Sequence, residues 1–175
     1  MSGSTQRSVA WWQRKVESLI GSEMNCDVFV RSLCPPVGAH AQQERVIERL
    51  QEHEREGTVS DVSVHVWGEA ICPSSCVASS AVGTDLLEKV QDIRNWSKVH
   101  DTDTVFEVRE VHSSITDETY LKLIPPRICL LVSSDESPEL VFPHETDGVN
   151  VCVTSFLDAL ERQTTEQPSG IESSA

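Results

Sequence analysis

The sequence predicts an α/β protein in which a βαβ unit forms part of a mixed sheet. Residues 27–33 are rich in β-branched and aromatic side chains and stop at a Cys-Pro-Pro triplet, where proline cannot donate to a sheet. Residues 40–56 repeat apolar side chains at the spacing of one helical face. Residues 60–67 alternate valine with other residues, as half-buried strands do. This succession predicts two parallel strands joined by a right-handed helical crossover.

The rest of the chain is expected to complete this sheet. A helix over 85–98, capped by Thr84, follows a small-residue loop over 68–83. The apolar run at 127–132 is typical of a buried strand. Four strands and a last helix are expected at 104–112, 119–124, 127–132, 139–142 and 155–162, the helix with Thr154 or Ser155 as its cap.

The N-terminal part has an amphipathic pattern of its own. Apolar residues recur every three or four positions over 8–20, which predicts a helix, and its polar flank suggests that it is appended to the core rather than part of it. We therefore expect three parts: a polar segment and appended helix over 1–24, a single α/β domain over 25–162, and a disordered polar tail over 163–175.

Charge is the strongest signal in the composition. The chain has 28 Asp and Glu residues against 14 Lys and Arg, for a net charge of −14, and arginine far exceeds lysine among the basic residues. Such an excess of one sign repels itself in the compact state, whereas molar salt shortens the Debye length to about 3 Å and screens the repulsion. We therefore expect a halophilic protein; the alternative is an acidic protein from an ordinary cytosol.

The sequence also predicts a cytoplasmic protein that makes no membrane contact. No apolar run reaches about 18 residues, and the start of the chain lacks the apolar segment of a signal peptide. Its six cysteines are therefore expected to be reduced. Cys26, Cys129 and Cys152 lie among apolar residues and are expected to be small hydrophobic side chains.

The order of the expected elements resembles the thioredoxin fold, most closely in the closing hairpin and helix. Cys34 follows the first core strand and precedes a helix, whose N-terminus favours a thiolate. Pro125-Pro126 stand where a thioredoxin has its cis-proline. The segment after Cys34 lacks the second cysteine of a C-x-x-C motif. Cys34 is thus a candidate thiol-redox residue, with a purely structural cysteine as the alternative.

A second cysteine pair has the spacing of metal ligands. Cys72 and Cys76 form a C-x₃-C motif, which is within the range that zinc sites use. A structural zinc site needs four ligands, and Cys34 with His40 or His65 could complete this one only through the fold. The alternatives are two incidental thiols in a small-residue loop, or a disulfide across it.

The absence of several catalytic and nucleotide-binding motifs argues against common enzyme classes. The sequence contains no H-E-x-x-H, G-x-S-x-G, Walker A or G-x-G-x-x-G motif, so no catalytic residue and no cofactor other than zinc is expected. The helix at 40–56 is acidic on balance, and no basic cluster interleaves with aromatic residues. Charge therefore does not support DNA binding.

Several segments together resemble one group of proteins. These segments are FVRSLCPP, VIERL, VHVWG, REVHSSITDETY, PPRICLL and VFPHETDG. Over about residues 27–161 the chain resembles short haloarchaeal proteins of unknown function, some of which carry the label of a helix-turn-helix domain. The resemblance implies a haloarchaeal cytoplasmic protein and supplies no ligand or site residue.

These observations lead to three hypotheses about function. The first is a regulatory or interaction module that binds a protein partner and has no conventional active site. Its expected mark is an exposed apolar patch, under Trp11 and Trp12. The second is a helix-turn-helix transcriptional regulator that binds DNA. The third is a thiol-redox or zinc protein of thioredoxin-like fold, centred on Cys34 or on Cys72 and Cys76.

Overall fold

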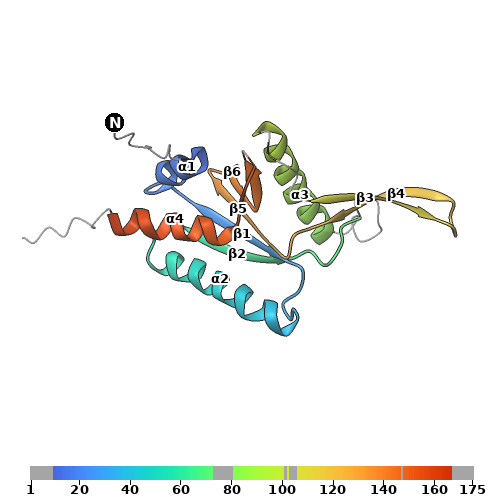
Figure 1. Cartoon of the computed structure of the whole chain (residues 1–175), viewed down its shortest axis with the longest axis horizontal. Coiled ribbons are helices and arrows are strands. Elements are labelled where there is room, and N and C mark those ends of the chain that lie inside the picture. The colour runs from blue at the N-terminus through green and yellow to red at the C-terminus, as the bar shows by residue number, and fades with distance from the viewer. Residues whose placement is uncertain (1–9, 73–80, 101, 103–105, 147, 167–175) are drawn as a thin grey trace, which may run out of the picture.

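A computed structural model describes residues 10–72, 81–100, 102, 106–146 and 148–166. Its centre is a four-stranded sheet of order β2-β1-β5-β6 (Figure 1). The strands are β1 (Asn25–Val30), β2 (Asp61–Val66), β5 (Ile128–Ser134) and β6 (Ser137–Phe142). β1 pairs in parallel with β2 and antiparallel with β5, and β6 pairs antiparallel with β5. The predicted α/β class with a mixed sheet is confirmed.

The predicted βαβ unit forms β1, α2 (Val37–Arg55) and β2. β1 is a central strand and is buried on both faces, with Val28, Phe29 and Val30 inaccessible to solvent. Among the described strands β2 has no neighbour on its outer side. The strand forms where the alternation predicted it, but Val64 and Val66 are exposed because no described helix covers this edge. β5 is buried along most of its length, as its apolar run predicted.

Helices cover both faces of this sheet. α3 (Ala81–Val99) lies on one face, where the indole N–H of Trp96 donates to the Glu139 carbonyl of β6 at 2.9 Å. α2 and α4 (Val153–Glu166) lie side by side on the other face (Figure 1). Arg49 of α2 ties them together through hydrogen bonds to Asp158 and Glu161 of α4.

The N-terminal helix belongs to the core and is not merely appended to it. α1 (Trp11–Leu19) forms where the pattern predicted a helix, but its apolar stripe of Trp12, Val16 and Leu19 is buried. It packs against α4 and β6, and Lys15 forms an ion pair with Glu139 of β6 at 2.7 Å. The helical periodicity predicted the helix correctly. The exposed apolar patch expected under Trp11 and Trp12 is wrong, because Trp12 is buried and Trp11 packs half-buried against the core.

Some boundaries differ from the predicted ones because tertiary contacts extend the elements. α3 begins at Ala81, so Thr84 lies inside the helix and is not its cap. α4 begins at Val153 and continues to Glu166, which places the first part of the predicted tail in a helix. Two short strands, β7 (His144–Thr146) and β8 (Val149–Val151), were not predicted.

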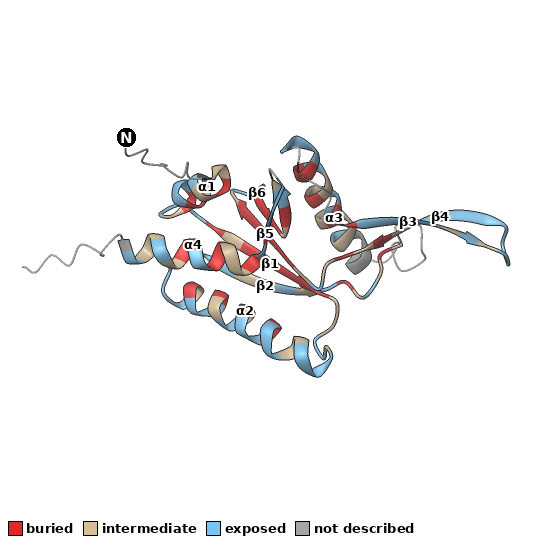
Figure 2. Ribbon diagram, viewed as in Figure 1, coloured by how far each residue is buried: buried red, intermediate tan, exposed pale blue. Residues whose placement is uncertain are grey.

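One element extends away from the body. β3 (Glu107–Ser113) and β4 (Glu118–Ile124) form an antiparallel hairpin that projects beyond the sheet and helices (Figure 1). Its only pairing with another described segment is a bridge between Leu123 and Ile71 at the base. Buried residues line the sheet and the inner sides of the helices, whereas the hairpin strands are exposed or half-buried except at Leu123 near the base (Figure 2). None of the described helices has the length and apolar character needed to cross a membrane.

Candidate functional site

A hollow of about 240 Å³ lies where β1 runs into α2. Cys34 occupies the connecting loop and is exposed. The side chains around it come from the end of β1, the first turns of α2, the segment after β2 and the start of β5: Arg31, Ser32, Cys34, Pro35, Pro36, Ala39, Gln42, Gln43, Glu69, Arg127 and Ile128. The fold therefore brings Cys34 to the end of the sheet where the Pro-Pro segment leads into β5.

Hydrogen bonds hold the shape of this hollow. Arg31 donates from its guanidinium to the carbonyl of Pro125, which links the end of β1 to the segment that precedes β5. The buried amide of Gln43 donates to the Ser32 carbonyl at 2.9 Å. Both side chains satisfy backbone carbonyls that no strand pairs with, so they fix the loop without using its thiol.

The thiol of Cys34 itself has few chemical partners. Its backbone N–H donates to the Ser32 hydroxyl at 3.0 Å, and within the described part of the chain no hydrogen bond reaches its sulfur atom. Pro125 and Pro126 follow trans peptide bonds, and the cis bond of the described segments precedes Pro143 instead. The expected cis-proline opposite Cys34 is therefore wrong for this pair.

A second thiol lies in an adjoining hollow of about 190 Å³. Cys152 stands between β8 and α4 and is exposed, whereas its apolar sequence context predicted burial. The two hollows share Gln42, Arg127 and Ile128 in their linings, so they adjoin, and each is lined by one thiol. We call this surface the two-thiol groove.

The surroundings of Cys152 favour its ionised form. Its sulfur atom lies 2.9 Å from the Thr154 hydroxyl oxygen and 3.2 Å from that of Ser155. Partial burial by itself would raise the pKa of this thiol, but hydrogen bonds from the side chains and backbone N–H groups of Ser155 and Thr154 outweigh the burial and lower the pKa below its usual range. In the sequence, the run Cys-Val-Thr-Ser at the start of a predicted helix was the feature that could have indicated an ionised thiol at Cys152.

The other cysteines divide into buried and undetermined ones. Cys26 and Cys129 are buried, as predicted, and burial raises the pKa of both thiols far above the usual range. Cys72 is half-buried, and Cys76 lies outside the described residues. No cluster of three metal-ligating side chains occurs among the residues that the structure describes. The zinc site stays a prediction.

A charged triad crosses the opposite face of the sheet. Asp27 of β1 accepts hydrogen bonds from His65 of β2 at 2.8 Å and from Lys89 of α3 at 3.3 Å. Burial alone would raise the pKa of the Asp27 carboxyl, but the bond from His65 and the charge of Lys89 lower it overall. These contacts anchor α3 to the sheet through an otherwise costly buried charge.

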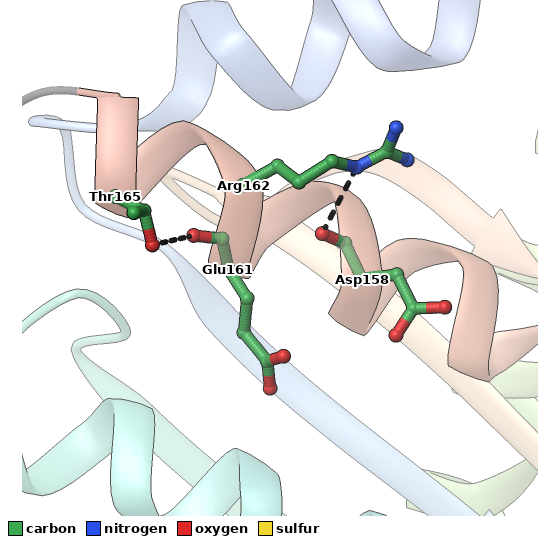
Figure 3. A pocket seen from close by; sticks show the side chains of 4 residues that line it. All are labelled: Asp158, Glu161, Arg162 and Thr165. Carbon is green, nitrogen blue, oxygen red and sulfur yellow. Dashed lines mark hydrogen bonds between the residues drawn. The ribbon is translucent and has the colours of Figure 1, made fainter.

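A broader hollow of about 510 Å³ lies along α4 and is lined by Asp158, Glu161, Arg162 and Thr165 (Figure 3). Arg162 and Thr165 donate to carbonyls of their own helix. The two carboxylates bind Arg49 at 2.9 Å, and hydrogen bonds to them raise its pKa in spite of partial burial. The two carboxylates that line this hollow thus stabilise the packing of α2 on α4.

The hairpin carries three exposed apolar side chains. Val108 and Leu121 lie on one face of the ribbon and are 46% and 50% exposed, and Ile115 near the turn is 94% exposed. The ribbon also carries four acidic residues, Glu107, Glu110, Asp117 and Glu118, against Arg109 and Lys122. The hairpin therefore combines exposed apolar side chains with a net negative charge.

Together these features define a mixed α/β protein with an exposed hairpin arm and a two-thiol groove. A family model described as a helix-turn-helix domain matches residues 20–165, and the chain belongs to this family. No curated protein and no solved structure matches the chain.

The described elements do not contain the motif that the family is named for. A helix-turn-helix motif needs two helices joined by a short turn. Here β1 separates α1 from α2, β2 separates α2 from α3, and six strands separate α3 from α4. The family membership stands, but across the described residues no two consecutive helices are joined by a short turn.

Proposed function

We propose that the protein is a regulatory or interaction module that binds a protein partner through the β3–β4 hairpin and has no conventional active site. The observation that carries this proposal is the isolation of the hairpin. A two-stranded ribbon is at best marginally stable alone in water. This one pairs with the described body only through the bridge between Leu123 and Ile71, and Leu123 is the one residue of its strands that is buried in the core. The surface of a partner would cover the hairpin side chains that the body leaves exposed to solvent.

The chemistry of the hairpin indicates the kind of surface it fits. Val108, Leu121 and Ile115 supply apolar contact, and the surplus of acidic side chains surrounds them. An apolar centre with a charged rim is typical of transient protein interfaces. The complementary partner is therefore a protein with an apolar patch bordered by basic residues, because opposite charges steer such encounters.

A photo-crosslinking amino acid at position 115 tests this contact in cells that express the full chain. We expect one discrete protein adduct from this position. The double variant Val108→Ser/Leu121→Ser should reduce the adduct about tenfold or more, because loss of two apolar contacts costs at least 1.4 kcal/mol of binding at the usual value for buried area.

The matched control is Val99→Ser, which changes a valine that is 80% exposed at the end of α3. This variant should leave the adduct unchanged. The proposal fails if position 115 yields no discrete adduct, or if the control weakens the adduct as much as the double variant does. Circular dichroism of each variant establishes that the body remains folded.

A DNA-binding transcriptional regulator is the second candidate, and the family match over residues 20–165 is what favours it. Both the net charge of −14 and the acidic balance of the hairpin oppose attraction to phosphates. A DNA contact would therefore have to depend on base edges more than on the backbone.

Selection from random duplexes in molar potassium chloride separates the two candidates. A DNA-binding regulator should enrich one sequence motif over successive rounds, because high salt removes the non-specific phosphate term. Recovery of unenriched sequence after several rounds would exclude this second candidate and leave the protein-partner proposal untouched.

A thioredoxin-like fold and a salt-rich cytoplasm as the habitat remain part of our proposal. The parallel β1–β2 pair, the closing β5–β6 hairpin and the final helix support the first. The surplus of 28 acidic over 14 basic residues supports the second. Unfolding on dialysis into dilute buffer, reversed by potassium chloride, is the expected sign of the second.

A further inference from the structure

The outer edge of β2 is a part of the fold that the proposed hairpin contact does not use. In the four-stranded sheet, β2 pairs with β1 on one side and with no described strand on the other. The Trp67 N–H donates to the Val30 carbonyl at 3.0 Å, and alternate residues of a strand bond to opposite sides. The backbone groups of Val62, Val64 and Val66 therefore point away from β1, toward the free edge.

Two of these outward N–H groups lack an acceptor among the described residues. The Val62 N–H donates to the carboxylate of Glu54 from α2, whereas no such bond joins Val64 or Val66 to another described residue at this edge. Their side chains are 38% and 48% exposed. Unpaired donors and carbonyls beside exposed apolar side chains form a template for a further strand.

The opposite outer strand of the sheet is protected, and β2 is not. β6 contains Pro138 and Glu139, a β-bulge interrupts its pairing with β5, and α1 packs against it. Proline, charge, bulges and covering helices are the devices that keep an edge strand from pairing with another chain. Residues 62–66 of β2 contain no proline and no Asp, Glu, Lys or Arg, and the register with β1 runs without a bulge.

A hollow of about 520 Å³ lies beside this edge, where β2 and the first half of α3 meet. It is lined by Val64, His65, Val66, Asp85, Leu86, Glu88 and Lys89. Two carboxylates thus stand close to a lysine and a histidine, so each sign of charge finds its complement when the same surface is presented to itself. In a chain of net charge −14, this mixed patch is where a second copy meets less repulsion than elsewhere.

We propose that the β2 edge pairs antiparallel with the same edge of a second copy, around a two-fold axis at Val64. In this register Val64 faces its own equivalent and Val62 faces Val66, so each valine of the edge faces a valine. The Val64 N–H donates to the Val64 carbonyl of the second copy, and the Val66 N–H donates to the Val62 carbonyl. Every unpaired donor of the edge gains an acceptor, and the bond from Val62 to Glu54 is kept.

The size of the contact indicates a dimer that dissociates on dilution. β2 has six residues, and one strand pair of this length is small beside the roughly 1,200–2,000 Å² that stable interfaces bury. Side chains of α3 around the hollow therefore have to contribute. Molar salt screens the repulsion between two acidic copies and should favour the dimer.

Sedimentation velocity of the full chain over a concentration series in molar potassium chloride tests the proposal, and the unchanged chain should pass from monomer to dimer. Val64→Pro should raise the dissociation constant about tenfold or more, because it removes the axial N–H donors while the pairing with β1 needs no donor from this position. The matched variant Val64→Thr keeps the N–H and the β-branched shape and should dimerise as the unchanged chain does. Circular dichroism establishes that both variants are folded.

The register is tested separately by oxidative linking, which does not depend on the proline variant being folded. Val64→Cys should link two copies through position 64, because this residue faces itself across the axis. Ser63→Cys, which faces His65 of the second copy, should link several-fold less. Peptide mapping distinguishes these links from those between native cysteines.

Three results would overturn the proposal: a chain that is monomeric at every concentration, a folded Val64→Pro that dimerises as well as Val64→Thr, or equal linking at positions 63 and 64. A monomer would leave an extended segment of another protein as the occupant of the edge. None of these results affects the hairpin contact, which is measured at position 115.

Discussion

The body and the hairpin of this protein are built from the same kind of strand but are stabilised differently. β1 and β5 are buried on both faces by helices, and nearly every apolar side chain on them is inaccessible. β3 and β4 pair with each other over seven residues each, but only Leu123 among their residues is buried, and the others are exposed or half-buried (Figure 2). Hydrogen bonding is similar in the two regions, so the difference between them is apolar burial.

This contrast indicates where stability and function reside. Backbone hydrogen bonds exchange with water at little net gain, whereas removal of apolar area from water drives folding. The apolar burial within the body is therefore sufficient to stabilise its fold. The stability of the hairpin depends instead on its contacts with the body at its base or on contacts with a partner. Regions of low local stability are commonly the ones that bind.

Truncation of a central side chain of the body should give the largest loss of stability. Phe29 is fully buried in β1 and stacks on Trp67 and His65. We expect Phe29→Ala to lower the free energy of unfolding by about 3–5 kcal/mol, because it removes this contact and leaves a cavity. Urea unfolding followed by circular dichroism measures the change.

The hairpin supplies the comparison for this variant. Tyr120 is the half-buried aromatic residue of β4, and Tyr120→Ala should cost about 1 kcal/mol or less, as is usual for a cross-strand pair. Equal losses for the two variants would show that the hairpin is as firmly integrated as the body, and the contrast drawn here would be wrong.

The sequence predicted the body well because the signal there is local. The apolar run of β5 and the helical stripe of α2 each reflect burial that the fold then supplies. The alternation of β2 predicted the strand but not its exposure at the edge of the sheet. It failed for β7 and β8, which are three residues long and too short to show a period. It also failed to place α1, because the partners of its stripe lie in β6 and α4, far along the chain.

The candidate site was only half visible in the sequence. Cys34 was noticed because it lies between a strand and a helix. Cys152 was missed because Val151 and Val153 on either side are buried, and burial alternates where a strand gives way to a helix. No sequence pattern shows that Arg127 would stand between the two thiols, since only the fold brings three distant segments together.

The pH dependence of stability should also separate body from hairpin. His144 is 2% exposed and packs against Trp11, Trp96 and Phe142, while its Nδ1 lies 2.6 Å from the Val141 carbonyl. Burial lowers the pKa of His144 below 6.5, and the charge of His100 adds to this effect. The folded state then binds fewer protons than the unfolded chain at mildly acidic pH.

The sign of the effect follows from this difference in bound protons. The stability contributed by neutral His144 is complete above about pH 6.5 and is lost as the pH falls below that value, at about 1.4 kcal/mol for each unit of pKa difference. His144→Phe should flatten this part of the pH profile. The control His112→Phe, which changes an exposed histidine of β3, should leave the profile unchanged.

The smallest expected effect is on the hairpin face itself. Leu121 is half exposed, so Leu121→Ser should change the free energy of unfolding of the isolated chain by about 0.5 kcal/mol or less. The same substitution belongs to the pair that should weaken the crosslinked adduct about tenfold. Urea unfolding and adduct yield on the same variant therefore measure folding and binding separately. A side chain that contributes little to folding but much to partner contact is what the hairpin proposal requires, and a loss of stability comparable to that of Phe29→Ala would instead make Leu121 part of the core.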